Sequence, residues 1–310
     1  MERRQLEYFI AVVDHGGFTA AAHALHVAQP SLSHSIRTLE RELGGSLFHR
    51  LPQGVTLTSA GEAMVGSARQ VLRDFATAKS SVREILGLNG GRLDIVSQTT
   101  LAVDPLAGLL GRFHTLYPKV GVRVSDGEHG SEIVQSVRTG QCELGLVDAS
   151  ARPSGSGTAG GTVDGAVTES DLSGIELPEQ EMHVVLPPND PHRHTSTIGL
   201  RELAERELIV TPPGTATRDT VDEVCARVGV APRIVVETTH RAMIVPLVLA
   251  GTGACLLPTS MAAEATLHGA RMLSTRPRLL RRGRLVWRSG PLSPAARAFV
   301  ELAEQEAGGK

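Results

Sequence analysis

The sequence predicts an α/β fold with an all-α N-terminal part, and three observations lead to this prediction. Apolar residues recur at helical spacing through the first ninety residues. The pattern breaks at Asn89-Gly90-Gly91, and short β runs then alternate with helices in two series. The chain has 310 residues, 41% of them hydrophobic, which is enough for more than one core. Aromatic residues make up only 3%, so these cores must consist mainly of Leu, Val, Ile and Ala.

The first 45 residues predict three helices. An amphipathic helix ends at Gly16-Gly17, and a short alanine-rich helix begins at Thr19. A third helix begins near Pro30 and ends at Gly44-Gly45. This succession is the geometry of a helix-turn-helix, whose second helix enters the major groove of DNA. Two short extended runs around Pro52-Gln53-Gly54 predict a hairpin after it.

The third helix offers polar side chains on its predicted solvent side, and these suit base edges and phosphates. They are Gln29, Ser31, Ser33, His34, Ser35 and Arg37. The hairpin adds His49 and Arg50, and an arginine on such a wing can insert into a minor groove. The alternative is a small helical bundle with a solvated face.

A long helix follows, beginning at the capping-box spacing of Ser59 and Glu62. Its apolar positions advance in steps of four and three, a 3.5-residue repeat that favours a two-helix coiled coil. They are Met64, Ala68, Val71, Phe75, Ala78, Val82 and Ile85. The rest of this helix is polar, so we expect no other core for it to join. We therefore expect a homodimer.

Two βαβ series occupy the rest of the chain. The first has the strands RLDIVS, VGVRVS and CELGLVD, and the second has MHVVLP, LIVTP, IVVE and ACLLP. Each series implies a doubly wound subdomain, with helices covering a mostly parallel sheet. The Gly/Ser/Thr-rich stretch 150–165 between them predicts a flexible loop, and the chain ends with a strand, RLVWRS, and a helix. We expect the basic stretch 271–288 to be a solvated strand edge protected by charge, with a second nucleic-acid patch as the alternative.

Ligands of doubly wound sheets bind beyond the carboxyl ends of the strands, where helices begin. This rule selects candidate effector-binding residues at five strand ends, namely Ser97, Thr99, Thr100, Glu128, His129, Asp148, Thr211, Thr215, Thr217 and His240. Hydroxyls and free N–H groups at helix starts favour a small anion, commonly a carboxylate. Glu128 and Asp148 would repel an anion unless His129, His240 or Arg218 offset them, so the charge of the effector stays open. An ordinary helix cap is the alternative role for each threonine.

Several classes of protein are excluded. The cysteines Cys142, Cys225 and Cys255 are odd in number and far apart, which argues against disulfides and a zinc site and fits a reducing cytosol. We expect a cytoplasmic protein, because the sequence has no signal peptide and no apolar run of about 20 residues. No hydrolase, metalloprotease or Walker motif is present, so we expect no catalytic residue, metal or cofactor. A pure solute-binding protein would leave the first ninety residues unexplained.

The run FTAAAHALHVAQPSLSHSIRTLERELGGSLFHR, followed by VTLTSAGE, resembles the winged helix-turn-helix of LysR-type transcriptional regulators. The stretches ELGLVDA, LIVTPPGTATRD and LVLAGTGACLLPTSMA resemble later family segments. The resemblance implies an effector-binding unit similar to periplasmic binding proteins, with its pocket between two subdomains, and tetrameric assembly. It also implies DNA contacts from the recognition helix and wing, at Gln29, Pro30, Ser33, His34, Ser35, Arg37 and Arg50.

Two features depart from the family pattern. Family members usually carry Arg and Gln where this chain has His34 and Ser35, and a mostly neutral histidine attracts phosphate less strongly. The stretch 150–165 is also longer than is usual in the family.

We therefore predict a DNA-binding regulator that senses a small effector. Its predicted parts are a winged helix-turn-helix (1–58), a dimerisation helix (59–88) and a regulatory domain (92–310). The regulatory domain divides into subdomain I, about 92–165 and 270–310, and subdomain II, about 166–269. The alternative is an effector-independent regulator or architectural DNA-binding protein. Residues 1–60 hold five arginines against five acids, so we expect an isolated head to bind DNA poorly and a dimer on a pseudo-palindromic site to bind well.

Overall fold

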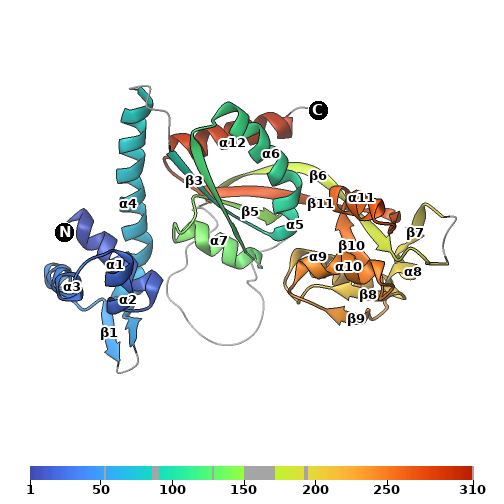
Figure 1. Cartoon of the computed structure of the whole chain (residues 1–310), viewed down its shortest axis with the longest axis horizontal. Coiled ribbons are helices and arrows are strands. Elements are labelled where there is room, and N and C mark those ends of the chain that lie inside the picture. The colour runs from blue at the N-terminus through green and yellow to red at the C-terminus, as the bar shows by residue number, and fades with distance from the viewer. Residues whose placement is uncertain (52–53, 86–90, 128, 150–171, 192–194, 309–310) are drawn as a thin grey trace.

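The N-terminal part has the predicted order of elements. The computed structural model describes residues 1–51, 54–85, 91–127, 129–149, 172–191 and 195–308. The first elements are α1 (Arg3–His15), α2 (Phe18–Ala24), α3 (Gln29–Leu43), β1 (Phe48–Leu51), β2 (Gly54–Leu57) and α4 (Ser59–Ile85). They form one end of an elongated molecule (Figure 1). The predicted loop 150–165, the hairpin residues 52–53 and Glu128 lie outside the described residues.

Three of the six phenylalanines build the core of this N-terminal unit. The ring of Phe48, on β1, lies 5.3 Å from that of Phe9 and 5.6 Å from that of Phe18, measured between centroids. The apolar stripe of α3 packs into the same core with no exposed surface at Leu32, Ile36 and Leu39. A small unit buries little surface on folding, and large aromatic side chains bury the most surface per residue. The scarce aromatic residues therefore stabilise the smallest unit of the chain.

The first half of α4 joins this core, so the expectation that α4 has no core within its own chain is wrong. Ala68 is buried there, and Met64 and Val71 are partly buried against the same cluster. Farther along the stripe, Phe75 is a large apolar side chain with half of its surface exposed. The 3.5-residue repeat therefore combines positions that pack within the chain with a position that does not.

One seven-stranded sheet runs through the rest of the molecule, in the order β10-β6-β11-β5-β3-β4, with β7 also paired to β11. Its strands are β3 (Gly91–Ser97), β4 (Val120–Asp126), β5 (Leu144–Asp148), β6 (Leu172–Leu186), β7 (Thr197–Gly199), β10 (Cys255–Pro258) and β11 (Arg271–Arg288). The β3–β4 and β3–β5 pairs are parallel, whereas β11 is antiparallel to both β5 and β6. A separate parallel pair joins β8 (Glu207–Val210) and β9 (Arg233–Glu237).

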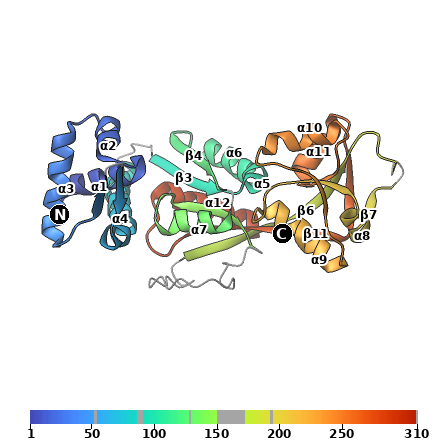
Figure 2. The ribbon, with the colours of Figure 1, turned by 90° about the horizontal axis from the view of Figure 1, so that it is seen from below.

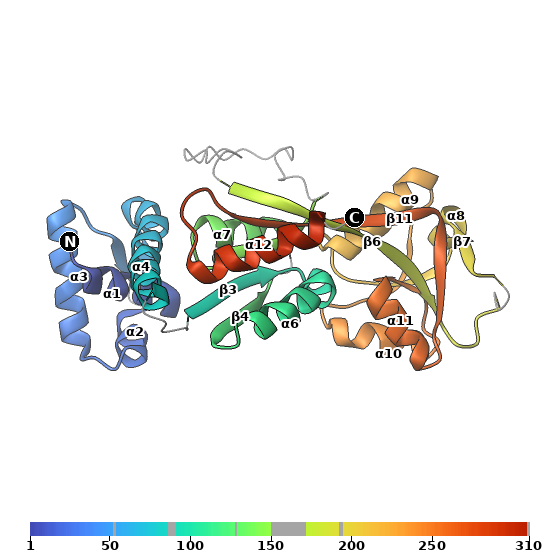
Figure 3. The same ribbon diagram turned by 90° about the horizontal axis from the view of Figure 1, so that it is seen from above.

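The two long strands β6 and β11 connect the two predicted βαβ series (Figures 1 and 3). The basic stretch 271–288 is therefore no sheet edge, because β11 has partners on both sides. Its charges are met across the strands: Arg282 lies 3.3 Å from Glu176 and 2.5 Å from Glu179, both on β6. Cross-strand pairing of opposite charges lets a polar sequence form a central strand.

Helices cover the sheet in two lobes, seen from below in Figure 2. The first lobe combines β3, β4 and β5 with α5 (Thr99–Leu101), η1 (Ala102–Leu106), α6 (Ala107–Leu116), α7 (Gly130–Arg138) and α12 (Pro294–Gly308). The second lobe combines β8, β9 and β10 with α8 (Leu200–Ala204), α9 (Ala216–Val228), η3 (Arg241–Met243), α10 (Ile244–Leu249) and α11 (Thr259–Leu267).

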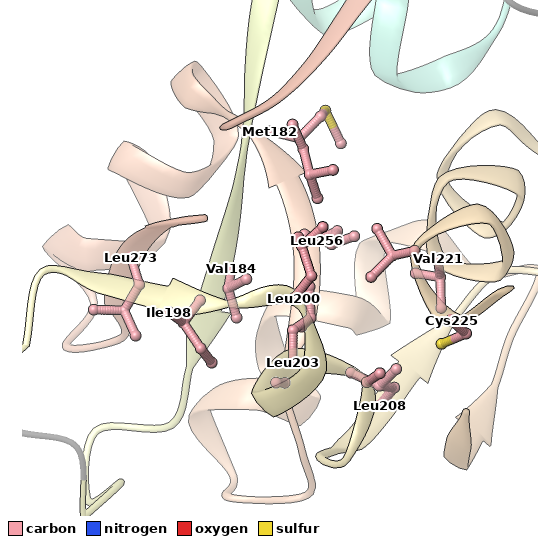
Figure 4. Packing of buried hydrophobic residues seen from close by; sticks show 14 of the residues in the cluster. Met182, Val184, Ile198, Leu200, Leu203, Leu208, Val221, Cys225, Leu256 and Leu273 are labelled. Atoms are coloured by element: carbon pink, nitrogen blue, oxygen red, sulfur yellow. The ribbon is translucent and has the colours of Figure 1, made fainter. Parts of the chain in front are cut away.

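Each lobe has its own apolar core. In the first lobe, Phe113 on α6 and Phe299 on α12 meet edge to face at 5.4 Å between centroids. The second lobe packs aliphatic side chains such as Val184, Leu203 and Leu256 into one cluster, with Cys225 beside Val221 at its edge (Figure 4). Cys255 is buried nearby, and burial raises its pKa to about 12. The thiols of Cys225 and Cys255 therefore act as small core side chains.

We expect Gly61→Ala to lower the free energy of unfolding of the N-terminal unit by about 1–3 kcal/mol. A Cβ at Gly61 would lie 2.2 Å from the backbone oxygen of Leu47, in the segment that leads into the wing. Urea denaturation of the full chain, followed by circular dichroism, measures the change.

Gly66→Ala is the matched control, because a Cβ at that position of the same helix meets nothing within 4 Å. It should stabilise the protein by about 0.5–1 kcal/mol, through better helix propensity. Equal effects of the two substitutions would contradict the packing of α4 against the wing.

Candidate DNA-binding face and ligand site

Most of the predicted DNA-reading residues lie on the exposed face of α3. Gln29, Pro30, Ser31, His34 and Arg37 are exposed, and Ser35 is half-buried. The helix lies at the outer end of the molecule in all three ribbon views, away from the two lobes (Figures 1–3). Pro30 in its first turn supports the helix start, and Gly44 at φ +74° ends it.

Ser33 does not lie on that face. Only 4% of its surface is exposed, because it follows Leu32 and precedes Ile36 by three positions and so shares their buried side of the helix. The 3.6-residue period already contains this information. The structure therefore places Ser33 among the packing residues of α3.

The wing is held at a fixed position relative to α3 by Glu40, a residue that the sequence analysis did not single out. Its Oε1 accepts hydrogen bonds from the backbone N–H groups of Leu47, at 2.9 Å, and Phe48, at 3.4 Å. In the hairpin itself, Arg50 on β1 pairs with Val55 on β2, and His49 is exposed. A charged acceptor for two N–H groups connects the recognition helix to the wing.

In the first lobe, several of the predicted effector residues come together at the ends of β3 and β5. Ser97 is fully buried and donates to the backbone oxygen of Gln98. The Gln98 side chain accepts a hydrogen bond from the backbone N–H of Asp148 at 2.8 Å. Thr99 donates to Asp126 at 2.7 Å, and the N-cap residue of α5 is Gln98 rather than Thr99.

The structure adds Arg281 to this group. Its guanidinium is almost completely buried and donates to Thr100 Oγ1 at 2.7 Å and to Gln180 Oε1 at 3.0 Å. Its Nε lies 3.8 Å from a carboxylate oxygen of Asp148. Burial lowers the pKa of Arg281, and the charge of Asp148 counteracts this. We call Gln98, Thr100, Asp148, Gln180 and Arg281 the strand-end cluster.

Two donors of the strand-end cluster are buried without a hydrogen-bond partner in the described part of the chain. They are Nε of Arg281 and Nε2 of Gln180. Buried donors in native proteins are nearly always paired, with protein, water or ligand. The cluster is therefore suited to receiving a group that accepts hydrogen bonds.

Arg281 could have been found from the sequence. In β11 the buried residues alternate with exposed ones, so Leu279, Arg281 and Leu285 all face inward. This is the period of two expected for a strand. The seven arginines of the stretch conceal the pattern, because most of them are exposed and only their position in the strand distinguishes Arg281 from the others.

The threonines of the second lobe line the start of α9. Thr211, Thr215 and Thr217 are all buried. Thr215 donates to the backbone oxygen of Pro212 at 2.8 Å, and its Oγ1 lies 2.5 Å from that of Thr211. Although Thr215 is the N-cap residue, its side chain makes no capping hydrogen bond.

His129 joins the two lobes. Its Nδ1 lies 3.0 Å from the backbone oxygen of Gly214, and this nitrogen must donate because a carbonyl can only accept. Close by, burial raises the pKa of Asp219, as the charges of Asp222 and Asp148 do to a smaller extent. His240 is exposed before η3, and its backbone N–H bonds Thr238 at 3.0 Å.

Within the described residues, no group of three or more His, Cys, Asp or Glu side chains could hold a metal ion. None of the described helices is long and apolar enough to cross a membrane.

Comparison with known proteins extends over nearly the whole chain. The family model of the bacterial regulatory helix-turn-helix protein, lysR family, matches residues 3–62, and that of the LysR substrate binding domain matches 87–308. The HTH-type transcriptional regulator BudR of Raoultella terrigena is 28% identical over 97% of this chain and 100% of BudR. ShiR, an HTH-type transcriptional regulator of Corynebacterium glutamicum, is 30% identical over 88% of this chain and 85% of ShiR.

A solved structure of full-length CbnR complexed with its target DNA has the same fold. Its TM-score is 0.67 at 24% identity, and the match covers 99% of this chain and 100% of CbnR. A helix-turn-helix joined to a substrate-binding unit defines a DNA-binding regulator that responds to small molecules. The chain belongs to the LysR family of transcriptional regulators. Proteins of this family are regulators rather than enzymes, bind DNA and small effectors, and form oligomers.

Proposed function

We propose that this regulator reads DNA with the exposed face of α3 and the wing, and senses a small carboxylate at the strand-end cluster between its lobes. The proposed DNA contacts come from Gln29, Pro30, Ser31, His34, Ser35 and Arg37 on α3 and from His49 and Arg50 on the wing. The exposure of the α3 residues supports this assignment, as does the fold shared with CbnR, which was solved with its target DNA. Burial of Ser33 argues for leaving it out of the reading set.

Arg37 is the strongest single contributor in this proposal. An exposed guanidinium on the recognition helix can bind a guanine edge with two hydrogen bonds or pair with a phosphate. His34 stands about one helical turn before it, and its imidazole contributes by hydrogen bonding. With five arginines against five acids in residues 1–60, non-specific attraction stays weak and placed contacts dominate.

We expect Arg37→Ala in the full chain to weaken specific promoter binding by about 1–3 kcal/mol, roughly tenfold or more. Arg227→Ala on α9 is the control, because Arg227 is an exposed arginine of the second lobe that pairs with Glu223. Fluorescence anisotropy with promoter DNA at a fixed salt concentration measures the dissociation constant of each variant.

Ser31→Ala and Ser33→Ala separate reading from packing on the same helix. Ser31→Ala should change promoter affinity and leave the melting temperature unchanged. Ser33→Ala should change the melting temperature and leave promoter affinity unchanged. The assignment of the reading face would be contradicted if Arg37→Ala bound the promoter like the wild type.

Homodimerisation through α4 is the second part of the proposal. The candidate positions were Met64, Ala68, Val71, Phe75 and Val82, but the first three pack against the N-terminal core. Phe75 supports an interface farther along the helix, because 51% of its surface is exposed. Among the described ring contacts of Phe75, the guanidinium of Arg3 lies over the ring, 5.9 Å from its centroid. A dimer would place two recognition helices on the half-sites of a pseudo-palindrome, and further pairing of the lobes would give a tetramer.

Phe75→Glu should shift the protein toward smaller assemblies, since it places a charge in an apolar seam. Light scattering coupled to gel filtration at several protein concentrations would show the shift. Leu267→Glu is the control, because Leu267 is 83% exposed at the end of α11. An unchanged assembly in Phe75→Glu would rule out this part of α4 as the interface.

The effector class follows from the strand-end cluster. A carboxylate oxygen can accept from Arg281 Nε and Gln180 Nε2, the two donors of this cluster that are buried without a hydrogen-bond partner in the described structure. The net charge of the cluster supports an anion only weakly, because Asp148 faces the same guanidinium. The proposal therefore rests on the unsatisfied donors. Ser97, Thr99, Thr211, Thr215, Thr217, His129 and His240 would line the same site.

A screen of small carboxylates by thermal shift on the full chain tests this proposal. A bound ligand at a hundred times its Kd stabilises a protein by about 2.7 kcal/mol. We expect Arg281→Gln to abolish the shift given by any carboxylate that stabilises the wild type.

Arg278→Gln is the matched control on the same strand, because the Arg278 side chain is 73% exposed. A carboxylate that stabilises Arg281→Gln as well as the wild type would place the site elsewhere. If no ligand shifts the wild type, the alternative of an effector-independent regulator is favoured.

We also propose that the protein works in the cytoplasm. Its three cysteines are free in the structure, and the DNA that it would bind is there. The predicted division into 1–58, 59–88 and 92–310 fits the same proposal, with β6 and β11 crossing between the two subdomains.

A further inference from the structure

A cavity of about 310 Å³ lies between α4 and the first lobe, far from the strand-end cluster along β11. Its walls are Gln70, Arg73 and Asp74 of α4, Cys142 and Glu143 before β5, and the segment 288–292 between β11 and α12. Figure 3 shows α4 beside the part of the lobe that holds α7 and α12. This volume is at the small end of the range found for ligand sites.

The two carboxylates of the cavity are already engaged. Glu143 accepts hydrogen bonds from the backbone N–H of Ser293 at 2.7 Å and from its hydroxyl at 2.8 Å, at the start of α12. Asp74 accepts from Gln70 Nε2 at 2.7 Å. Both acceptors therefore have partners that hold them in place.

The two guanidiniums of the cavity, those of Arg73 and Arg288, differ in their hydrogen bonding. Arg73 donates to the backbone oxygen of Gly140 and to Gln70 Oε1. Arg288 has a buried Nη1 without a hydrogen-bond partner in the described structure. Burial lowers the pKa of Arg73, and so does the positive charge of Arg288. Glu143 and Asp74 counteract this shift, and Arg69, which pairs with Asp14, adds to it.

We infer that this cavity binds a doubly charged oxyanion, of the phosphate or sulfate type, between Arg288 and Arg73. Planar guanidiniums match the oxygens of such an anion with paired hydrogen bonds. The anion would satisfy the unpartnered Nη1 of Arg288 and reduce the repulsion between the two cations. The exposed Ser289, whose hydroxyl lies 3.2 Å from that of Ser173, offers a further donor at the rim.

Such an anion would connect the DNA-binding head to the regulatory lobes. Arg73 belongs to the helix that carries the head, and Arg288 ends the strand that also holds Arg281. Gly140 shows how closely the two parts approach, since a Cβ there would overlap the Arg73 guanidinium. Binding of the anion would thus fix α4 against the first lobe.

Isothermal titration calorimetry of the full chain with inorganic phosphate and with sulfate, in chloride buffers of constant ionic strength, tests the inference. We expect saturable binding to the wild type with at least one of them, and at least tenfold weaker binding to Arg288→Gln. Succinate is a third titrant, and binding of succinate without phosphate or sulfate would overturn the assignment of the anion class.

Two further variants give the experiment its controls. Ser289→Glu places a carboxylate at the exposed rim, where it should compete with the anion without disturbing the core. This variant replaces Arg288→Gln as the test if Arg288→Gln folds poorly. Arg278→Gln removes an exposed arginine of the same strand and should bind phosphate like the wild type. Absence of binding to the wild type, or unchanged binding in both Arg288→Gln and Ser289→Glu, would overturn the inference.

Discussion

A guanidinium buried in the middle of a sheet must find acceptors, and the regulatory half of this protein depends on how Arg281 finds them. Its partners are the hydroxyl of Thr100, the amide of Gln180 and the carboxylate of Asp148. These residues belong to α5, β6 and β5, so one cation connects three elements to β11. Removing one partner of such a buried group is costly, whereas a ligand that completes the set is favoured.

The long strands β6 and β11 connect this cluster to both lobes and to the side of the molecule that faces the head. They pair from Arg271 and Leu186 to Arg288 and Leu172, through both lobes. Toward the second lobe they support the core around Leu256, and the His129–Gly214 hydrogen bond is a second connection between the lobes. Toward the head, β11 ends at the cavity beside α4. A small movement of one lobe against the other can therefore reach the DNA-binding head through packed elements.

Local patterns predicted much of this architecture from the sequence. The helices of the head, their glycine ends and the alternating series of strands follow from short-range periodicity and turn chemistry. The exposed face of α3 was also predictable, although strict use of the helical period would have removed Ser33 from it.

Features set by pairing across long sequence distances were not predictable in the same way. The lengths of β6 and β11 depend on partners about a hundred residues apart, such as Arg282 and Glu179. The packing of α4 on its own head depends on how α1 and the wing meet it, which the 3.5-residue repeat does not reveal. Arg281 is only partly predictable from the sequence. Its inward position follows from the period of the strand, but the identity of its hydrogen-bond partners does not.

A crystal structure of the full chain with a carboxylate that stabilises it would test the central claim most directly, since that claim is that the strand-end cluster receives the effector. The account predicts a carboxylate oxygen within hydrogen-bond distance of Arg281 Nε and Gln180 Nε2. A ligand bound elsewhere, with ordered water satisfying both donors, would contradict it.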